Sequence, residues 1–392
     1  MSTQDGVVRV SRLREGVGFE VRVREWESPE SCTDVKDLDC LPSMVRNRIT
    51  KTSAVEVDVS SCGLTTLPKE IYGLNNLTRL FLYENQLTCL PSEIRGLNNL
   101  TCLSLSDNQL TCLPPEIGGL WSLTGLYLAR NQLKGLPSEI GGLWNLEELD
   151  LLLNRLTALP SEIGQLTNLT WLDLSRNDLG TLPPEIGQLT NLTWLNLVWT
   201  QLTALPEGIS GLGKLAWLGL SENQLTCLPP WIGELRNLTD LYLAENQLTG
   251  LPPEISELTQ LTCLDLSGNA LKALPPEISE LTQLTCLDLS GNALTALPSE
   301  IGRLTNLTRL DLARNQLTGL PLEIGELKKL TELYLAWNQL TDVLPGIREL
   351  KKLKKLDLSW NQLTSVPPWI GELTELTDLS VSGCGGFGGW WR

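Results

Sequence analysis

The stretch Leu77–Pro91 reads LTRLFLYENQLTCLP and contains the pattern from which the fold can be predicted. Its Leu80-x-Leu82 alternation predicts a short β-strand, with both leucines facing a core and the residue between them facing outward. Asn85 follows this strand, where its side-chain amide can satisfy backbone polar groups of a turn. Leu87, Leu90 and the closing proline then continue an apolar pattern beyond the turn.

The same pattern recurs every 23 residues without an insertion. Thr200 takes the place of the asparagine in one unit, and the spacing extends outward to Cys62 and Cys384. A fixed period of this length indicates a repeat architecture in which each coil packs on its neighbours. We therefore predict about 15 coils of 23 residues, with the asparagine at Asn85, Asn108, Asn131, Asn154, Asn177, Asn223, Asn246, Asn269, Asn292, Asn315, Asn338 and Asn361.

The second half of each unit predicts a short helix. In LPSEIGQLTNL (residues 159–169), the proline and the acidic residue suit a first helical turn, and Ile163 and Leu166 are expected to face the core. Stacked coils would place the strands in one parallel sheet on a concave side and the helices on the convex side. The predicted fold class is an α/β solenoid.

The unit LPxEIGxLTNLTxLDLSxNQLT resembles the leucine-rich-repeat family over residues 55–381. It looks most similar to the intracellular Ras-group and Roco-type repeats, and it lacks the Ile-Pro unit of extracellular plant receptors. This resemblance implies a leucine-rich-repeat horseshoe with a concave parallel sheet and short convex helices. It also implies a role in protein interaction.

Three segments follow from the repeat boundaries: residues 1–50, the array at 51–384, and a Gly/Trp-rich tail at 385–392. Residues 1–50 contain alternating apolar runs and end in LPSMVRNRI, which predicts a short helix over the first coil. An open core needs a polar cap, so we expect an N-terminal cap, with a small separate module as the alternative. Trp390 and Trp391 would either cover the last coil or form a short docking motif.

The charge balance favours a basic partner. The net charge of −16 repels nucleic-acid phosphates and anionic lipid headgroups, so neither is expected to bind.

No run of 18 apolar residues occurs, and Met1 is not followed by signal-peptide features. We therefore expect a protein or peptide partner with a basic rim, and no membrane contact.

The cysteines and the glycosylation sequons both follow the repeat. Cys89, Cys112 and Cys227 share one position of the unit, and Cys102, Cys263 and Cys286 share another, which does not resemble a disulfide framework. We expect reduced thiols in the cytoplasm. The Asn-Leu-Thr sequons also share one position, so the repeat consensus explains them without glycosylation.

No catalytic motif is present in the sequence. It contains no histidine, which excludes Ser-His-Asp and Cys-His catalysis, and it contains no GxxxxGK[ST] loop and no kinase motif. Cys263 and Cys286 lie in segments 252–271 and 275–294, which are identical, so recent duplication explains the pair better than metal binding. We predict a protein that is not an enzyme and that needs no cofactor or metal.

A column of aspartates is predicted on the concave side, about one strand spacing apart. Paired carboxylates can bind calcium or act in acid–base catalysis, but Leu-Asp-Leu-Ser is also a common strand sequence of this family. A solvated acidic face is therefore the favoured interpretation, and a surface for a basic partner is the alternative. The column comprises Asp150, Asp173, Asp265, Asp288, Asp311 and Asp357.

Exposed strand positions that depart from the repeat predict the binding site. Trp171, Trp194 and Trp217 occupy one outward column in consecutive coils, and Val198 and Trp199 replace polar residues nearby. Tryptophan often dominates interface energies, although such rings can also simply stack on each other. The predicted concave-face site comprises Trp171, Trp194, Trp217, Val198, Trp199, Leu152, Asp150 and Asp173. A secondary candidate comprises Trp337, Trp360 and Tyr334, and Trp121 and Trp144 are expected to cover the flank.

These features favour a non-enzymatic interaction scaffold that binds a protein or peptide on its concave face. The Ras-group resemblance implies a place in small-GTPase signalling. The alternative is a ligand-sensing or regulatory repeat domain of an immune-type or Roco-type system.

Overall fold

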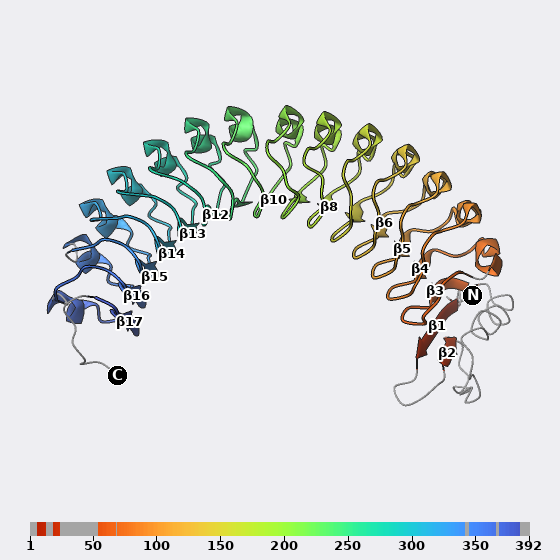
Figure 1. Ribbon diagram of the computed structural model, residues 1–392, viewed down its shortest axis with the longest axis horizontal. Helices are drawn as coiled ribbons and strands as arrows, with labels where there is room; N and C mark the ends of the chain where they lie inside the picture. The colour runs from red at the N-terminus through yellow and green to blue at the C-terminus, as the bar shows by residue number, and fades with distance from the viewer. Residues whose placement is uncertain are drawn as a thin grey trace, which may run out of the picture. The chain divides into compact units, whose positions relative to one another are not determined.

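The computed structural model describes residues 6–12, 19–23, 54–67, 69–341, 345–365 and 368–384. It contains two compact units, Met1–Asn196 and Leu197–Arg392. Within each unit, strands line the concave side of the stacked coils and short helices line the opposite side (Figure 1). The predicted solenoid of strand-and-helix coils is therefore confirmed.

The first unit begins with two strands that precede the repeats. β1 (Gly6–Arg12) pairs antiparallel with β2 (Phe19–Val23) and parallel with β3 (Ala54–Asp58). We propose that residues 1–50 cap the array through this pairing. The LPSMVRNRI stretch lies outside the described residues.

The rest of the first unit alternates short helices and strands. In order these are η2 Lys69–Gly73, β4 Arg79–Phe81, η3 Ser92–Gly96, β5 Cys102–Ser104, η4 Pro115–Gly119, β6 Gly125–Tyr127, η5 Ser138–Gly142, β7 Glu148–Asp150, η6 Ser161–Gln165, β8 Trp171–Asp173, η7 Pro184–Gln188 and β9 Trp194–Asn196. Each strand from β3 to β9 pairs in parallel with the next at an offset of 23 residues, as Trp171 does with Trp194.

The second unit continues the same alternation. Its elements are η8 Glu207–Gly211, β10 Trp217–Gly219, η9 Pro230–Glu234, β11 Asp240–Tyr242, η10 Pro253–Glu257, β12 Cys263–Asp265, η11 Pro276–Glu280, β13 Cys286–Asp288, η12 Ser299–Arg303, β14 Arg309–Asp311, η13 Leu322–Glu326, β15 Glu332–Tyr334, η14 Pro345–Glu349, β16 Lys355–Asp357, η15 Pro368–Glu372 and β17 Asp378–Ser380. The strands β10 to β17 are again parallel and in register. The tail with Trp390 and Trp391 lies outside the described residues.

The predicted helices are single 3₁₀ turns of five residues. In η6 the backbone N–H of Leu166 bonds to the carbonyl of Ile163, which closes the turn. Only a few residues separate the starting proline from the next core leucine, which is too short for a stable α-helix. Ile163 and Leu166 are fully buried, as the sequence predicts.

The repeated asparagine connects neighbouring coils. The Asn246 carboxamide nitrogen donates to the carbonyls of Leu220, one coil earlier, at 2.9 Å and Leu243 at 3.1 Å. Its oxygen accepts the N–H of Leu225 at 3.0 Å. This confirms the predicted role of the asparagine in satisfying buried backbone groups.

Candidate partner-binding surfaces

The strand face is the surface formed in each unit by the outward-pointing residues of its parallel strands. In the first unit, Trp171 and Trp194 occupy in-register positions of β8 and β9 on this face. Their neighbours Leu172 and Leu195 point inward and are fully buried, whereas both indoles are only half-buried. The two rings are stacked, with centroids 4.7 Å apart and planes 9° apart. The stacking covers one face of each ring and joins the two indoles into a single aromatic pair.

The carboxylates beside this pair mainly bond to the chain itself. Asp150 accepts the N–H of Leu152 at 3.0 Å. Asp173 accepts the N–H of Ser175 at 2.8 Å and its hydroxyl, and the carboxamide of Asn196 donates to its second oxygen at 3.2 Å. Asp173 is only 7% exposed, so at this position the predicted solvated acidic face is not observed. Asp150 and Leu152 are half-buried and remain accessible.

Burial changes the acidity of Asp150. It raises the pKa of this carboxyl to about 6; the Leu152 N–H opposes the shift and the nearby charge of Asp173 adds to it. Because Asp150 is more exposed than Asp173, it is the one of the two carboxyls that a basic partner could reach.

In the second unit, the remaining residues of the predicted site lie close together along the chain. Val198 is half-buried, and Trp199 is 50% exposed with a left-handed backbone (φ 56°). The Trp217 ring lies 5.3 Å from the Tyr242 ring at an angle of 40°. Thr200 is buried, and its hydroxyl lies within hydrogen-bond distance of the Leu197 carbonyl and the Asn223 carboxamide.

The secondary candidate forms a second aromatic stack. Trp337 and Trp360 are each 50% exposed, and their rings lie 4.5 Å apart at an angle of 11°. Both backbones are left-handed, which is unusual for a bulky residue. Gly383, in the next coil, lies beneath the Trp360 ring, where a β-carbon would approach the ring atoms to 2.7 Å.

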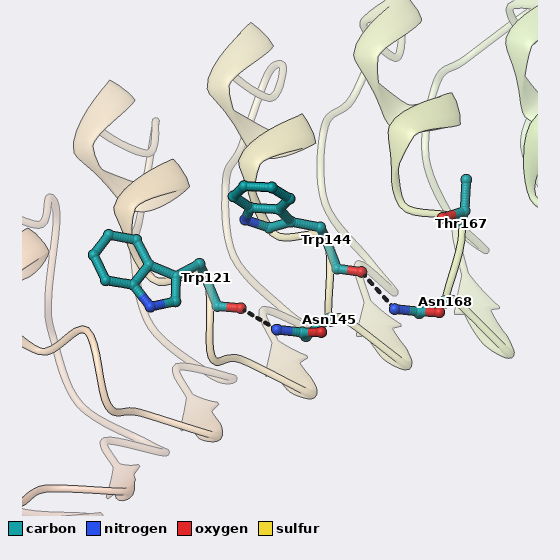
Figure 2. Close-up of a pocket in the computed structure, with 5 residues that line it drawn as sticks. All are labelled: Trp121, Trp144, Asn145, Thr167 and Asn168. Carbon is teal, nitrogen blue, oxygen red and sulfur yellow. Dashed lines mark hydrogen bonds between the residues drawn. The ribbon is translucent and has the colours of Figure 1, made fainter.

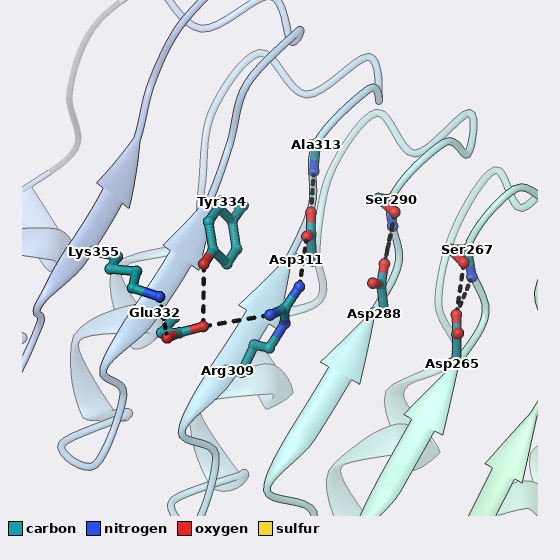
Figure 3. Close-up of polar contacts among 10 residues, drawn as sticks. All are labelled: Asp265, Ser267, Asp288, Ser290, Arg309, Asp311, Ala313, Glu332, Tyr334 and Lys355. Carbon is teal, nitrogen blue, oxygen red and sulfur yellow. Dashed lines mark hydrogen bonds and ion pairs between the residues drawn. The ribbon is translucent and has the colours of Figure 1, made fainter. Parts of the chain in front are cut away.

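Tyr334 belongs to a polar network on the strand face of the second unit (Figure 3). Glu332 accepts bonds from Tyr334 at 3.1 Å, Lys355 at 2.9 Å and Arg309 at 3.4 Å. These cations lower the pKa of Glu332, with the Lys355 bond as the largest cause. Arg309 also lies 3.5 Å from Asp311 and stacks over the Tyr334 ring. The candidate is therefore an aromatic stack with a charged network nearby.

The aspartate column of the second unit repeats the turn bond seen at Asp150. The acceptor–donor pairs are Asp265–Ser267, Asp288–Ser290, Asp311–Ala313 and Asp357–Ser359, the first three drawn in Figure 3. Each carboxylate caps the backbone two residues after it, which is a structural role. Among the described residues, no group of three or more potential ligands is placed to hold a metal ion.

A surface pocket on the flank of the first unit was not part of the predicted site (Figure 2). Trp121 and Trp144, which are 48% and 62% exposed, line it together with Asn145, Thr167 and Asn168. The carboxamides of Asn145 and Asn168 donate to the carbonyls of Trp121 and Trp144, both at 2.8 Å. The sequence signal for this pocket was the 23-residue spacing of two tryptophans.

The flank bond explains the repeated Asn-Leu-Thr sequence. The equivalent carboxamides of Asn99, Asn237 and Asn306 also donate to a carbonyl 24 residues earlier, in the preceding coil. The asparagine of the sequon thus has a structural role between neighbouring coils, which agrees with a consensus origin of this position. Within the described part of the chain, no helix has the length and apolar character needed to cross a lipid bilayer.

Comparison with known families identifies the repeat. The leucine rich repeat model matches residues 52–110 and overlapping segments of residues 121–294, and a leucine-rich repeat region model matches residues 287–385. The chain belongs to the leucine-rich-repeat family. It matches no curated protein sequence at a significant level.

Solved structures agree with this assignment. A leucine-rich-repeat protein of Leptospira interrogans is 39% identical, with a TM-score of 0.78 over 86% of this chain and 93% of the other. The ectodomain of the Arabidopsis thaliana receptor kinase GASSHO1/SCHENGEN3, solved with CASPARIAN STRIP INTEGRITY FACTOR 2, is 33% identical, with a TM-score of 0.56 over 81% of this chain and 45% of the other. The TLR13–ssRNA13 complex shows 27% identity and a TM-score of 0.73 over 86% and 51%.

Proposed function

We propose that this chain is a non-catalytic scaffold that binds a protein or peptide on its strand face. Leucine-rich-repeat proteins are in general protein-interaction scaffolds, and repeat arrays present extended concave surfaces suited to this role. In the first unit, the stacked pair of Trp171 and Trp194 is the anchor. This single observation carries the proposal, because a rigid, half-exposed aromatic surface loses little entropy when it is covered.

Leu152 and Asp150 complete the proposed contact in the first unit. Leu152 adds apolar area, and Asp150 is accessible to a lysine or arginine of the partner. The net charge of −16 favours the approach of a basic surface and disfavours nucleic acid. In the second unit, Trp337, Trp360 and Tyr334 form a separate proposed contact, and Val198, Trp199 and Trp217 form another.

The repeat type supports a more specific hypothesis. On the resemblance of the repeat unit to the Ras-group repeats, we propose that the chain acts in small-GTPase signalling within the cytoplasm. The eight cysteines described by the structure are unpaired thiols, which agrees with a reducing compartment.

Partner capture from a lysate of the source organism tests the proposal. The wild-type chain is compared with Trp171→Ala/Trp194→Ala and with the flank variant Trp121→Ala/Trp144→Ala, after circular dichroism has verified all folds. We expect a partner that the strand-face variant loses and the flank variant keeps. Equal retention by all three proteins would exclude the first-unit anchor, and a small GTPase among the lost partners would support the signalling role.

A further inference from the structure

Two cysteines lie side by side on the strand face of the second unit. Cys263 in β12 and Cys286 in β13 are in-register partners, so their α-carbons are about one strand spacing, ~4.8 Å, apart. This separation lies within the range of about 4.4–6.8 Å found in disulfides. Both thiols are free and half-exposed, and their neighbours Leu264 and Leu287 point inward.

Their surroundings give the two thiols different acidities. Cys286 accepts a hydrogen bond from Cys263, which lowers the pKa of Cys286 against the opposing effect of burial, and the Arg309 cation lowers it further. Asp265 and Asp288 raise this pKa but do not outweigh these effects. The same hydrogen bond raises the pKa of Cys263 and burial adds to that shift, while a hydrogen bond with Tyr242 opposes it.

The adjacency and the different acidities of the two thiols suit Cys286 as the attacking nucleophile and Cys263 as the resolving thiol. A thiol with a lowered pKa is more fully ionised at neutral pH and therefore attacks disulfides more readily, and a second thiol within reach completes the exchange. Duplication of the segments 252–271 and 275–294 accounts for the origin of the pair. It does not account for the cation beside Cys286, because Arg309 lies outside both segments and is the in-register neighbour of Cys286 in β14.

We propose that Cys263 and Cys286 form a dithiol site that undergoes thiol–disulfide exchange with small disulfides such as glutathione disulfide. The Cys286 thiolate attacks one sulfur of the oxidant, so that the S–S bond breaks and one glutathione leaves as a thiolate. Cys263 then loses its proton to solvent, attacks the Cys286 sulfur and expels the second glutathione. Overall, two protein thiols become one disulfide, and one glutathione disulfide becomes two glutathione molecules.

The chain contains a matched control at the same strand position. Cys102 is half-exposed in β5, and its in-register neighbours are Arg79 and Gly125, so no cysteine adjoins it. Cys102 can form a mixed disulfide with glutathione but has no resolving thiol on either neighbouring strand. The proposal therefore predicts different products for cysteines that occupy the same position of the repeat but have different neighbours.

Peptide analysis of the wild-type protein tests the proposal directly. The native protein is incubated anaerobically with glutathione disulfide, alkylated with N-ethylmaleimide and digested with trypsin. Cleavage after Arg236, Lys272 and Arg303 places Cys263 in peptide 237–272 and Cys286 in peptide 273–303. We expect these two peptides joined by a disulfide, and Cys102 either glutathionylated or alkylated. Cys263 and Cys286 modified singly, in the same proportion as Cys102, would overturn the proposal.

Two variants test the order of the steps. In Cys263→Ser, Cys286 should stop at a stable glutathione adduct. In Cys286→Ser, modification of Cys263 should be at least about tenfold slower than modification of Cys286 in the wild type. Equal rates at the two positions would contradict the assignment of Cys286 as the attacking thiol.

Discussion

The indole rings of Trp171 and Trp194 lie almost parallel, with their centroids 4.7 Å apart, across two neighbouring strands of the first unit. Because the rings contact each other, their contributions to stability should not be independent. In a double-mutant cycle of Trp171→Ala and Trp194→Ala, we expect a coupling of about 0.5–1.5 kcal/mol in the free energy of unfolding. Urea denaturation gives this value, and additive effects of the two substitutions would show that the stack contributes no stability.

The buried asparagine after each strand should contribute far more to the free energy of unfolding than the exposed asparagine on the flank. Asn246→Ala leaves the buried carbonyls of Leu220 and Leu243 and the N–H of Leu225 without their partner, and should cost about 2–4 kcal/mol. Asn237→Ala removes one exposed bond to Gly213 and should cost less than about 1 kcal/mol. The urea midpoints of the two variants provide the comparison. Similar midpoints would contradict the role assigned to the buried carboxamide.

Asp150→Asn should stabilise the protein at neutral pH. Burial raises the folded-state pKa of Asp150 to about 6, from an ordinary value of 3.8, so the folded state binds the proton more tightly than the unfolded state does. The tighter proton binding therefore stabilises the folded state, fully below about pH 3.8, and this stabilisation is lost as the pH rises through 6. Asparagine stays neutral and can still accept the Leu152 N–H.

The free energy of unfolding of Asp150→Asn should therefore exceed that of the wild type by on the order of 1 kcal/mol at pH 8, with screening by solvent at this half-exposed site taken into account. The difference should vanish near pH 4. Thermal melting of both proteins across this pH range measures the difference. Asn196 occupies the position equivalent to Asp150 and Asp173 in the next coil, so the strand accepts an amide at this position of the repeat. A difference that does not depend on pH would exclude titration of Asp150 as its cause.

Gly383→Ala should separate Trp360 from Trp337. The new β-carbon would lie 2.7 Å from the Trp360 ring, and the left-handed backbone (φ 73°) adds strain of about 1 kcal/mol. We expect a lower melting temperature and a loss of near-ultraviolet circular dichroism from the stacked rings. Gly371→Ala is the control, because among the described residues no atom beyond those of its own helix and chain neighbours lies within 4 Å of its β-carbon. An unchanged spectrum in Gly383→Ala would contradict the contact.

Much of the fold could be predicted because one 23-residue pattern sets the phase of every coil. The Leu-x-Leu alternation places Leu172 in the core and Trp171 outside, and the fixed period makes Trp171 and Trp194 in-register neighbours. The bonds of Asn246 follow from the need to satisfy buried backbone groups at a turn. These features depend on the backbone, which the repeat determines.

The exposure of outward side chains could not be predicted in the same way. It depends on contacts with neighbouring coils, which a strand pattern does not encode. Asp173 is buried and accepts bonds from Ser175 and Asn196, whereas Asp150, one coil earlier, is half-exposed. The flank pocket of Trp121 and Trp144 likewise depends on how adjoining coils place two rings.

The central claim is that a partner covers the strand face, and site-specific photocrosslinking tests it most directly. A photoreactive amino acid is placed at Leu152, two residues beyond β7 and beside the strand face of the first unit, or at Trp144, on its flank. Each protein is then irradiated in a lysate of the source organism. The account predicts a crosslinked partner from position 152 that is absent from position 144 and that disappears in the Trp171→Ala/Trp194→Ala background. A partner crosslinked from position 144 and not from 152 would contradict the account.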